Sequence, residues 1–437
     1  MTALPQAFLE RMQAQLGEEF PAFLASYNEP YARGIRFNPL KPCSAALDGL
    51  GDPVPWEPEG RYLSLTSPAG KLALHEAGAY YLQEPSAMLP VAVLDPHPGE
   101  RVLDLCAAPG GKSTQIAARM AGQGLLVCNE PVFKRAQVLA QNVERMGVIN
   151  ALVVSALPRQ LADRWAGGFD AVLVDAPCSG EGMFRRHPET REEWSAESPT
   201  GCAKRQAEIL DAAARLVRPG GRLVYATCTL NPTENEETVT RFCERNPAFS
   251  PQAWRVPGAE APEGMLTCFP HRMRGEGQFA ALLTRDGDAE AELATDQSLK
   301  VPEKAMLQAL REFSPDAPKP TALLGDTMVC LPDCPDLRGV KALRVGLHLG
   351  STKGKVFRPD HAWAVSMRPP EVSRVALNEA QARAYLAGET IPAEGHGWVL
   401  AAFAGLALGW GKISDGVLKN HYPKELRKVL PSPNEFL

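Results

Sequence analysis

Short apolar runs alternate with amphipathic stretches through the middle of the chain. The runs of strand length lie at residues 101–106, 124–129, 150–155, 169–174, 221–225 and 279–284. The stretches between them that predict helices lie at residues 111–121, 132–145 and 203–217. This alternation is typical of a doubly wound α/β domain, in which helices cover both faces of a mostly parallel sheet.

The pattern changes on either side of this region. Residues 6–16 place Phe8, Leu9, Met12 and Leu16 at helical spacing. Three prolines between residues 50 and 60 predict a loop there. Acidic residues after Asp286 predict a linker, and the segments 397–403 and 406–410 predict a hairpin around Gly405. We therefore divide the chain at these points into residues 1–90, 91–285, 286–299, 300–375 and 376–437.

Cysteines follow two of the predicted buried strands. Cys178 lies in Asp175-Ala-Pro-Cys-Ser-Gly180, and Cys228 lies in Ala226-Thr-Cys-Thr229. The carboxyl ends of parallel strands form the ligand crevice of an open sheet, and a thiol is a good nucleophile near neutral pH. A free cysteine alone is most often a small buried apolar residue. Two such cysteines and Asp175 at one sheet edge instead predict covalent chemistry on an electrophilic ring.

A loop with two glycines joins the first core strand to its helix, in Asp104-Leu-Cys-Ala-Ala-Pro-Gly-Gly-Lys-Ser113. Gly110 and Gly111 let a ligand approach the backbone at the helix amino end. A nucleotide-triphosphate loop is excluded, because Cys106 stands where that motif requires its first glycine. Glu130 ends the next strand, where a carboxylate can accept both hydroxyls of a ribose. A carboxylate that stabilises a helix start is the alternative role of Glu130.

Composition adds limits on location and metal binding. Of the 437 residues, 45% are hydrophobic and 22% are charged, as in ordinary globular proteins. No signal-peptide pattern opens the chain and no apolar run approaches about 18 residues, so we expect no membrane span. The ten cysteines show neither disulfide spacing nor paired metal-ligand spacing. We therefore expect reduced cysteines, a cytoplasmic protein and no metal site.

Basic residues gather in two stretches although the net charge is −5. Residues 337–359 carry six basic and no acidic side chains, and in residues 412–428 cations interleave with His421 and Tyr422. Such stretches can bind phosphates, and a solvated surface explains them equally well. Tyr422 among cations predicts stacking on an unpaired base. Other candidates for RNA contact are Arg185, Arg186, His187 and His271, whereas Trp398 and Trp410 are expected to fill a small core.

Three motifs together resemble those of a known family. Residues 104–112, Asp175-Ala-Pro-Cys-Ser-Gly-Glu-Gly182 and Thr227-Cys-Thr229 resemble the RNA cytosine carbon-5 methyltransferases of the Nol1/Nop2/Sun family. Arg36-Phe-Asn38 and residues 81–87 are similar to the family's amino-terminal extension. Residues 270–279, 409–412 and 418–423 resemble its F-type bacterial subgroup, which has a PUA-like end and methylates small-subunit ribosomal RNA.

The resemblance implies a Rossmann-like class I methyltransferase core at residues 91–285. It implies an RNA-contacting α+β extension before the core, then an intermediate RNA-binding domain and a PUA-like β-rich domain after the linker. S-adenosylmethionine is the implied methyl donor, and small-subunit ribosomal RNA or an assembly intermediate is the implied partner. The residues that the resemblance places around the donor are Cys106, Ala107, Ala108, Pro109, Gly110, Gly111, Lys112, Glu130 and Asp175.

The resemblance also implies roles for the three residues at the strand ends. Cys228 would attack carbon 6 of cytosine, Cys178 would help to resolve the adduct, and Asp175 would contact ring nitrogen 3 and the exocyclic amine. In DNA cytosine methyltransferases the Pro-Cys cysteine itself attacks, so Cys178 stays open as the nucleophile. The family usually has a carboxylate after the third strand, where this chain has Ser155-Ala-Leu-Pro158. The adenine contact is therefore left to backbone groups or to the Ser155 hydroxyl.

Two other functions remain open on these residues. The chain could be a ribosome-assembly RNA-binding factor with a vestigial methyltransferase core, which the missing third-strand carboxylate would allow. It could also be a DNA methyltransferase, although no region resembles a target-recognition domain.

Overall fold

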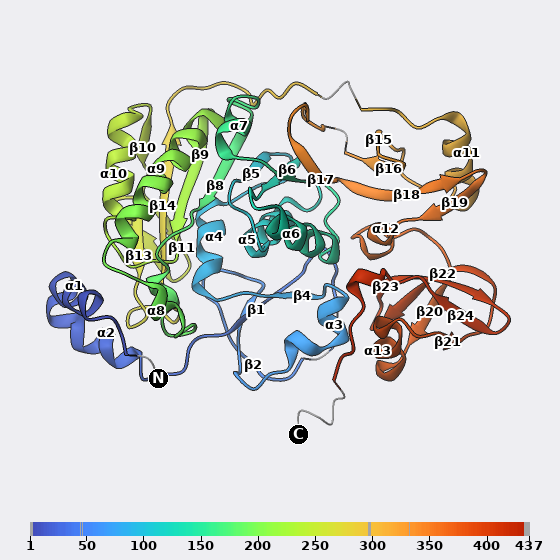
Figure 1. The fold of residues 1–437 in the computed structure, drawn as a ribbon, viewed down its shortest axis with the longest axis horizontal. Coiled ribbons are helices and arrows are strands. Elements are labelled where there is room, and N and C mark those ends of the chain that lie inside the picture. Colours follow the sequence, from blue (N-terminus) through green and yellow to red (C-terminus); the bar gives the residue numbers. More distant parts are fainter. Residues whose placement is uncertain (1–2, 44, 46, 296–298, 332, 432–437) are drawn as a thin grey trace.

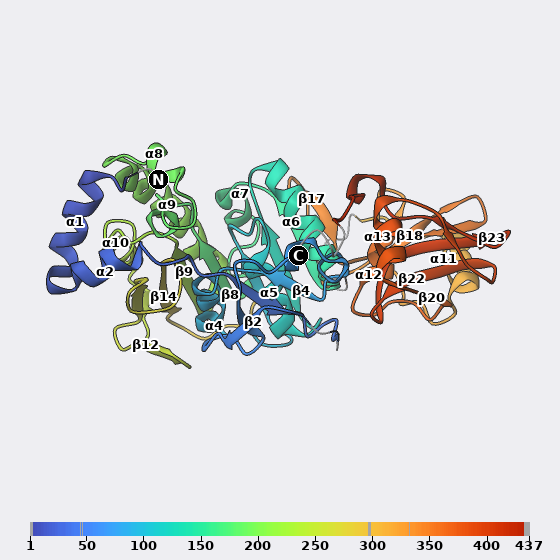
Figure 2. The same cartoon turned by 90° about the horizontal axis from the view of Figure 1, so that it is seen from below.

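The computed structural model describes residues 3–43, 45, 47–295, 299–331 and 333–431. Figures 1 and 2 show the parts of the molecule in a row, with α1 and α2 at one end and the carboxy-terminal sheets at the other. The central α/β region lies between them. Among the described helices, none is long and apolar enough to cross a bilayer.

The central sheet has nine strands within the described residues, in the order β10-β14-β9-β8-β5-β6-β7-β17, with β13 paired to β14. Its strands are β5 (Arg101–Asp104), β6 (Leu125–Asn129), β7 (Ala151–Ser155), β8 (Phe169–Asp175), β9 (Val217–Thr227), β10 (Phe249–Pro251), β13 (Met265–Cys268), β14 (Gln278–Arg285) and β17 (Lys341–Val345). Strands β5 to β9 are parallel, whereas β14 is antiparallel to β9. The predicted parallel α/β core is confirmed.

Helices cover both faces of this sheet. They are α4 (Leu89–Leu94), α5 (Gly111–Met120), α6 (Phe133–Arg145), α7 (Pro158–Ala162), α8 (Thr190–Glu193), α9 (Ser198–Leu216) and α10 (Glu236–Arg245). Along β5, Val102 belongs to the apolar cluster that includes α5 and α6 residues, and Leu103 to the cluster that includes α9 residues. Successive strand side chains point to opposite faces, so a strand buried on both sides is apolar throughout.

A small antiparallel sheet forms most of the amino-terminal extension. Its strands, in the order β2-β3-β1-β4, are β1 (Gly34–Phe37), β2 (Leu50–Pro53), β3 (Gly60–Leu63) and β4 (Tyr80–Leu82). The helices of the extension are α1 (Gln6–Leu16), which confirms its prediction, α2 (Phe20–Ser26) and α3 (Ala73–Glu76). The prediction of a loop over residues 50–60 was wrong at both ends, since Leu50–Pro53 form β2 and Gly60 begins β3. Pro53 ends β2, an edge strand, where a missing N–H is tolerated.

Two further sheets and three helices form the carboxy-terminal part. The first sheet contains β15 (Ala322–Leu324), β16 (Thr327–Cys330), β18 (Leu347–Lys353) and β19 (Val356–Pro359). The second contains β20 (Arg374–Leu377), β22 (Gly397–Phe403), β23 (Leu406–Ser414), β24 (Val417–Asn420) and β21 (Ile391–Pro392). The helices are α11 (Lys304–Phe313), α12 (His361–Val365) and α13 (Glu379–Ala387). The β22–β23 hairpin confirms its prediction.

Strand β17 ties this carboxy-terminal part to the core. It lies within residues 300–375 but pairs antiparallel with β7, with Lys341 opposite Ser155 and Val345 opposite Leu152. The segment assigned to an intermediate domain therefore supplies an edge strand of the central sheet. The division between the core and the following segment at residues 286–299 therefore applies to the sequence order, and the boundaries of these parts remain a prediction.

Candidate active site

A cavity of about 1000 Å³ opens at the carboxyl ends of β5 to β9. Each of these strands is followed by lining residues, and α9 forms another wall. The lining side chains nearest the strand ends are Cys106, Ala108, Glu130, Pro131, Leu157, Pro158, Asp175, Ala176, Pro177, Cys178 and Cys228, with Ile209 and Ala212 from α9. Six of the predicted site residues therefore meet in one cavity.

The two predicted cysteines face each other in this cavity. The Sγ atoms of Cys178 and Cys228 lie 3.3 Å apart, and both thiols are free and half-buried. They meet because β8 and β9 are neighbouring parallel strands, with Asp175 opposite Ala226. The contact with Cys228 and burial raise the pKa of Cys178 well above its usual value. The pair can therefore hold one shared proton and one thiolate charge.

Lys112 pairs with the carboxylate at the end of β8. Its Nζ lies 2.7 Å from Asp175 Oδ2, and the lysine side chain is 12% exposed. Burial acts to lower the pKa of Lys112, but the negative charges of Asp175 and Cys228 outweigh it and raise that pKa. Lys112 is therefore a cation that pairs with a carboxylate and interacts electrostatically with Cys228.

The predicted donor loop lies against the cavity and is anchored on its other side. Cys106 and Ala108 line the cavity, whereas the rest of the loop lies outside the lining set. Gly110 has a φ of 113° at the start of α5, a conformation that favours glycine. Asn142 Nδ2 donates to Pro109 O at 2.9 Å, and Ala107 N donates to Asn129 O at 2.8 Å. A close-packed backbone with no side chain at the turn lets a ligand approach the backbone of this loop.

Asp104 is fully buried at the start of this loop. Its Oδ2 accepts a hydrogen bond from Ser113 Oγ at 2.6 Å, and its Oδ1 has no partner in the described part of the chain. Burial raises the pKa of Asp104 to about 7, because the charged form is poorly solvated there.

Glu130 places a buried carboxylate at the cavity wall. Its Oε1 accepts a hydrogen bond from Val132 N at 2.9 Å, and its Oε2 lies 3.4 Å from Arg135 Nη1. The first contact is the helix-start interaction that is the alternative role of this residue. The carboxylate still lines the cavity, so this position also fits a ribose.

Apolar side chains follow the third core strand, where the sequence lacks the carboxylate usual in the family. Ser155 Oγ donates to Pro131 O at 3.2 Å, so its proton is already used. Leu157, Pro158 and Pro131 line the cavity together with Ile209. Sequence reasoning missed these apolar walls, although Leu157 directly follows the strand. Flat apolar walls suit a purine ring.

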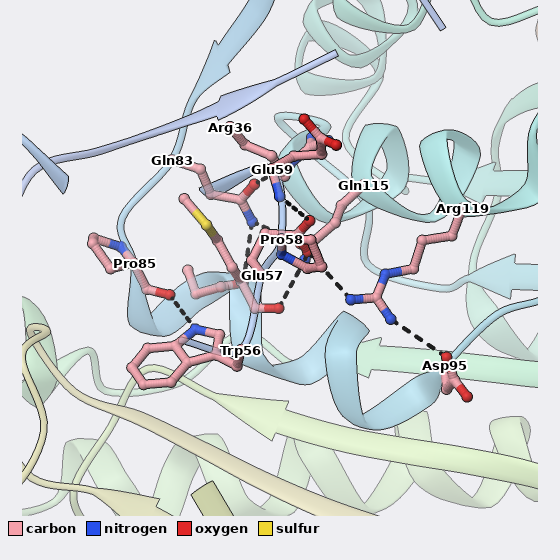
Figure 3. Close-up of polar contacts among 12 residues, drawn as sticks. Arg36, Trp56, Glu57, Pro58, Glu59, Gln83, Pro85, Asp95, Gln115 and Arg119 are labelled. Atoms are coloured by element: carbon pink, nitrogen blue, oxygen red, sulfur yellow. Dashed lines mark hydrogen bonds and ion pairs between the residues drawn. The ribbon is translucent and has the colours of Figure 1, made fainter. Parts of the chain in front are cut away.

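Arg36 of the amino-terminal sheet braces the first turn of α5. The buried guanidinium donates through Nη2 to Thr114 Oγ1 at 2.8 Å and to Gly111 O at 3.2 Å. Its Nε donates to Gln83 Oε1 at 3.1 Å, and Gln83 Nε2 donates to Gln115 Oε1 at 3.2 Å. Figure 3 shows Arg36 together with Gln83 and Gln115. The helix that begins at the donor loop is therefore held by the extension.

The same cluster continues to buried Glu57. Its Oε2 accepts a hydrogen bond from Gln115 Nε2 at 2.5 Å and lies 3.3 Å from Arg119 Nη2. Arg119 Nη1 also lies 3.4 Å from Asp95 Oδ1 (Figure 3). The positive charges of Arg36 and Arg119 thus face one buried carboxylate.

Several predicted RNA contacts have other roles in the structure. Tyr422 is buried and packs against Tyr385 and His361, so its assignment as an exposed stacking residue was wrong. The remaining candidates have partners: Arg185 with Glu276, Arg186 over the Tyr31 ring, His187 with Glu189, and His271 with Glu19.

Two separate basic stretches meet around Trp398. The His421 and Trp398 ring centroids lie 4.5 Å apart, and Lys412 Nζ lies 5.8 Å from the Trp398 centroid. Burial and the charges of Lys412 and Arg358 lower the pKa of His421. We call Arg358, Trp398, Lys412 and His421 the basic seam. Trp410 is buried as expected, whereas Trp398 is only half-buried.

Family models cover most of the chain. The model described as 16S rRNA methyltransferase RsmB/F matches residues 91–284, and the N-terminal domain of 16S rRNA methyltransferase RsmF matches residues 4–85. The first C-terminal domain of the RsmF rRNA methyltransferase matches residues 309–367, and the RsmF PUA domain matches residues 372–428.

Individual relatives and solved structures agree with these matches. Ribosomal RNA small subunit methyltransferase F of Salmonella paratyphi A is 34% identical over 97% of this chain and 96% of its own length. The same-named protein of Klebsiella pneumoniae is also 34% identical over 97% of this chain and 96% of its own length.

A methyltransferase homologue from Pyrococcus horikoshii has a TM-score of 0.53 and 27% identity, over 64% of this chain and 95% of its own. NSun6 of P. horikoshii, solved with the S-adenosylmethionine analogue SFG, has a TM-score of 0.58 over 65% of this chain and 99% of its own. At 22% identity, NSun6 supports the fold alone. With its motifs, cavity and full-length relatives in agreement, the chain belongs to the RsmF family of S-adenosylmethionine-dependent 16S rRNA methyltransferases.

Proposed function

We propose that this protein methylates carbon 5 of a cytosine in small-subunit ribosomal RNA through a covalent adduct on Cys228. The observation that carries the proposal is the pair of sulfur atoms, 3.3 Å apart, in the cavity that also holds Asp175 and Glu130. A cytosine ring needs a nucleophile at carbon 6 before carbon 5 can accept a methyl group, and a thiolate is such a nucleophile.

The walls of the cavity suit S-adenosylmethionine. Cys106 and Ala108 of the donor loop would hold its methionine end, Glu130 its ribose, and Leu157 and Pro158 its adenine. When bound, this donor supplies an electrophilic methyl group. The loop residues Ala107 and Pro109 to Gly111 would act by fixing the loop rather than by lining the cavity, and Lys112 would act through its pair with Asp175.

Charges around the sulfur pair favour Cys228 over Cys178 as the nucleophile. Lys112 interacts electrostatically with Cys228, so negative charge on that sulfur faces a cation. The pKa of Cys178 is raised instead, which keeps that sulfur protonated. Attack by Cys228 on carbon 6 would make carbon 5 electron-rich. The Lys112–Asp175 pair can supply the proton that ring nitrogen 3 needs as charge develops.

Resolution of the adduct requires the carbon 5 proton to leave and the carbon–sulfur bond to break. The electrons of that bond return to Cys228 as the double bond between carbons 5 and 6 reforms. Cys178 lies close enough to pass its thiol proton to the departing sulfur while its own sulfur takes the carbon 5 proton in the same elimination, so both cysteines end as thiols. This is the role proposed for Cys178.

The RNA must present an unstacked base to reach the two sulfurs. We propose that the amino-terminal extension and the carboxy-terminal sheets hold the RNA around the cavity. Support comes from the basic seam, where Lys412 and His421 lie against the half-buried Trp398 and the charge of Arg358 acts on His421. Aromatic faces among cations suit unpaired nucleotides.

Bisulfite sequencing of total RNA tests the function and locates the site together. RNA from cells with and without the gene is compared, and a strain that carries Cys228→Ala separates catalysis from the mere presence of the protein. We expect one or more cytosines of the small-subunit RNA to lose protection in both the deletion and the Cys228→Ala strain. Unchanged protection in the deletion strain would overturn the proposal.

A further inference from the structure

The carboxylate of Glu234 joins the two loops that carry the cysteines. It is fully buried, and its Oε2 accepts hydrogen bonds from Ser179 N and from Gln206 Nε2, both at 2.9 Å. Its Oε1 accepts a hydrogen bond from Ser179 Oγ. Ser179 Oγ in turn lies 2.9 Å from Thr229 Oγ1. Glu234 therefore holds the residue after Cys178 and, through Ser179, contacts the residue after Cys228.

Neutral groups alone pair with this carboxylate among the described residues. Glu181, on the neighbouring turn, pairs with Arg11 at 2.5 Å, but Glu234 forms no ion pair in that part of the chain. Burial raises the pKa of Glu234, while the hydrogen bonds from Ser179 and Gln206 oppose this effect because they stabilise the ionised form. The site therefore holds a buried negative charge without a cation of its own.

This charge is held on the Cys178 side of the pair, because Ser179, which donates two hydrogen bonds to Glu234, directly follows Cys178. The contact with Cys228 and burial are the main causes of the raised pKa of Cys178, and the charge of Glu234 adds to them. On the other side, Lys112 interacts with Cys228. The anion is bound to the residue after Cys178, and the cation interacts with Cys228, so the two possible positions of the shared proton are unequal.

We propose that Glu234 is a positioning residue that directs the shared thiol proton to Cys178 and so leaves Cys228 as the thiolate. This inference rests on the proposed function, since it explains why one cysteine of the pair attacks. The charged and titratable groups around the pair, apart from Glu234, are Lys112 of α5, Asp175 of β8, Glu181 with Arg11, Cys202 and Arg205 of α9, Tyr225 of β9, and Cys106.

Alkylation of the full-length protein with iodoacetamide tests the inference without RNA or methyl donor. Mass spectrometry follows the labelling of Cys178 and Cys228 separately between pH 6 and 9.5. In the wild type we expect Cys228 to react faster than Cys178. In Glu234→Gln we expect the ratio of the two rates to fall about tenfold, because a nearby charge shifts a pKa by about one unit. The labelling midpoint should rise for Cys228 and fall for Cys178.

A second variant removes the effect of the charge while keeping Glu234. In Gln206→Lys the ammonium can pair with the Glu234 carboxylate, and we expect the same fall in the rate ratio. The matched control is Glu237→Gln on α10, where the carboxylate is exposed and pairs with Arg241, and there the ratio should stay within about twofold. Loosened packing alone would not raise the labelling midpoint of Cys228 and lower that of Cys178 at the same time.

The outcomes separate this inference from the function on which it rests. Faster labelling of Cys178 in the wild type would contradict the assignment of Cys228 as the nucleophile. If Cys228 reacts faster in the wild type and the ratio is unchanged in a folded Glu234→Gln variant, the role of Glu234 is wrong. If Glu234→Gln does not fold, an unchanged ratio in Gln206→Lys would overturn that role.

Discussion

Arg36 and Thr114 join the amino-terminal extension to the helix that follows the donor loop, with Nη2 2.8 Å from Oγ1. The guanidinium is fully buried, so this contact is shielded from water. Strand β1 and the first turn of α5 therefore move together. The extension therefore supports the helix that follows the proposed donor loop, in addition to its expected RNA contact.

Replacing Arg36 by methionine should weaken donor binding. The change removes the hydrogen bonds to Gly111 and Thr114, and bonds to charged groups contribute about 1.5–3 kcal/mol each. We expect the Kd for S-adenosylmethionine, measured by isothermal titration calorimetry, to rise about tenfold. The control is Arg33→Met, which removes a nearby half-buried arginine whose hydrogen bonds among the described residues go to the carbonyls of residues 64, 65 and 67. Equal Kd values for the two variants would contradict the bracing role.

Asp104 should make stability fall as pH rises towards neutrality. Its folded pKa of about 7 lies above the ordinary value of 3.8, so the fold favours the protonated form. This stabilisation is fully present below about pH 3.8 and is lost as pH passes through about 7. Between pH 5 and 8, the Tm of the wild type should fall by roughly 2–4 °C more than that of Asp104→Asn. The control Asp163→Asn changes an exposed residue and should show the same dependence of Tm on pH as the wild type. If Asp104→Asn also shows the wild-type dependence, the prediction is contradicted.

Glu130→Gln should weaken donor binding without unfolding the protein. The carboxylate is proposed to accept the ribose hydroxyls, and an amide offers one acceptor and no charge. We expect the Kd for S-adenosylmethionine to rise about tenfold, or about 1.4 kcal/mol. Glu208→Gln changes an exposed residue of the same cavity and should alter the Kd less than about twofold. An unchanged Kd for Glu130→Gln would leave Glu130 with its helix-start role alone.

The basic seam should contribute to RNA affinity through its charges. The double variant Arg358→Ala and Lys412→Ala should bind a small-subunit RNA fragment more weakly, with the slope of log affinity against log salt reduced by about two. Filter binding at several salt concentrations measures both quantities. A control pair, Arg241→Ala and Arg245→Ala on α10, lies at the other end of the molecule (Figure 1). A double variant that retains the wild-type slope would show that the seam does not contact phosphates.

The core and its site were predictable because local patterns determine them. Apolar runs identified the parallel strands, and the residues after those runs had to meet at one sheet edge. The positions of Cys178 and Cys228 directly after two such runs were therefore enough to predict that they lie together. The hydrogen bonds of Glu234 were not predictable, since they depend on how the loops after β8 and β9 fold against α9.

Other features depended on pairing between distant segments. Nothing in residues 341–345 indicates β7 as their partner, because any apolar edge strand offers the same hydrogen-bonding groups. Tyr422 stands among cations in the sequence, yet Tyr385 and His361 enclose it in the fold. Its neighbour His421 is the exposed residue. Alternation along one segment could not decide which of these adjacent side chains points inward.

The identity of the attacking sulfur is tested most directly by trapping the adduct. Cys178→Ala and Cys228→Ala proteins are incubated with small-subunit RNA and S-adenosylmethionine, then separated on a denaturing gel. The account predicts an RNA-linked band for Cys178→Ala, because attack proceeds and resolution fails, and none for Cys228→Ala. An RNA-linked band for Cys228→Ala with none for Cys178→Ala would contradict it.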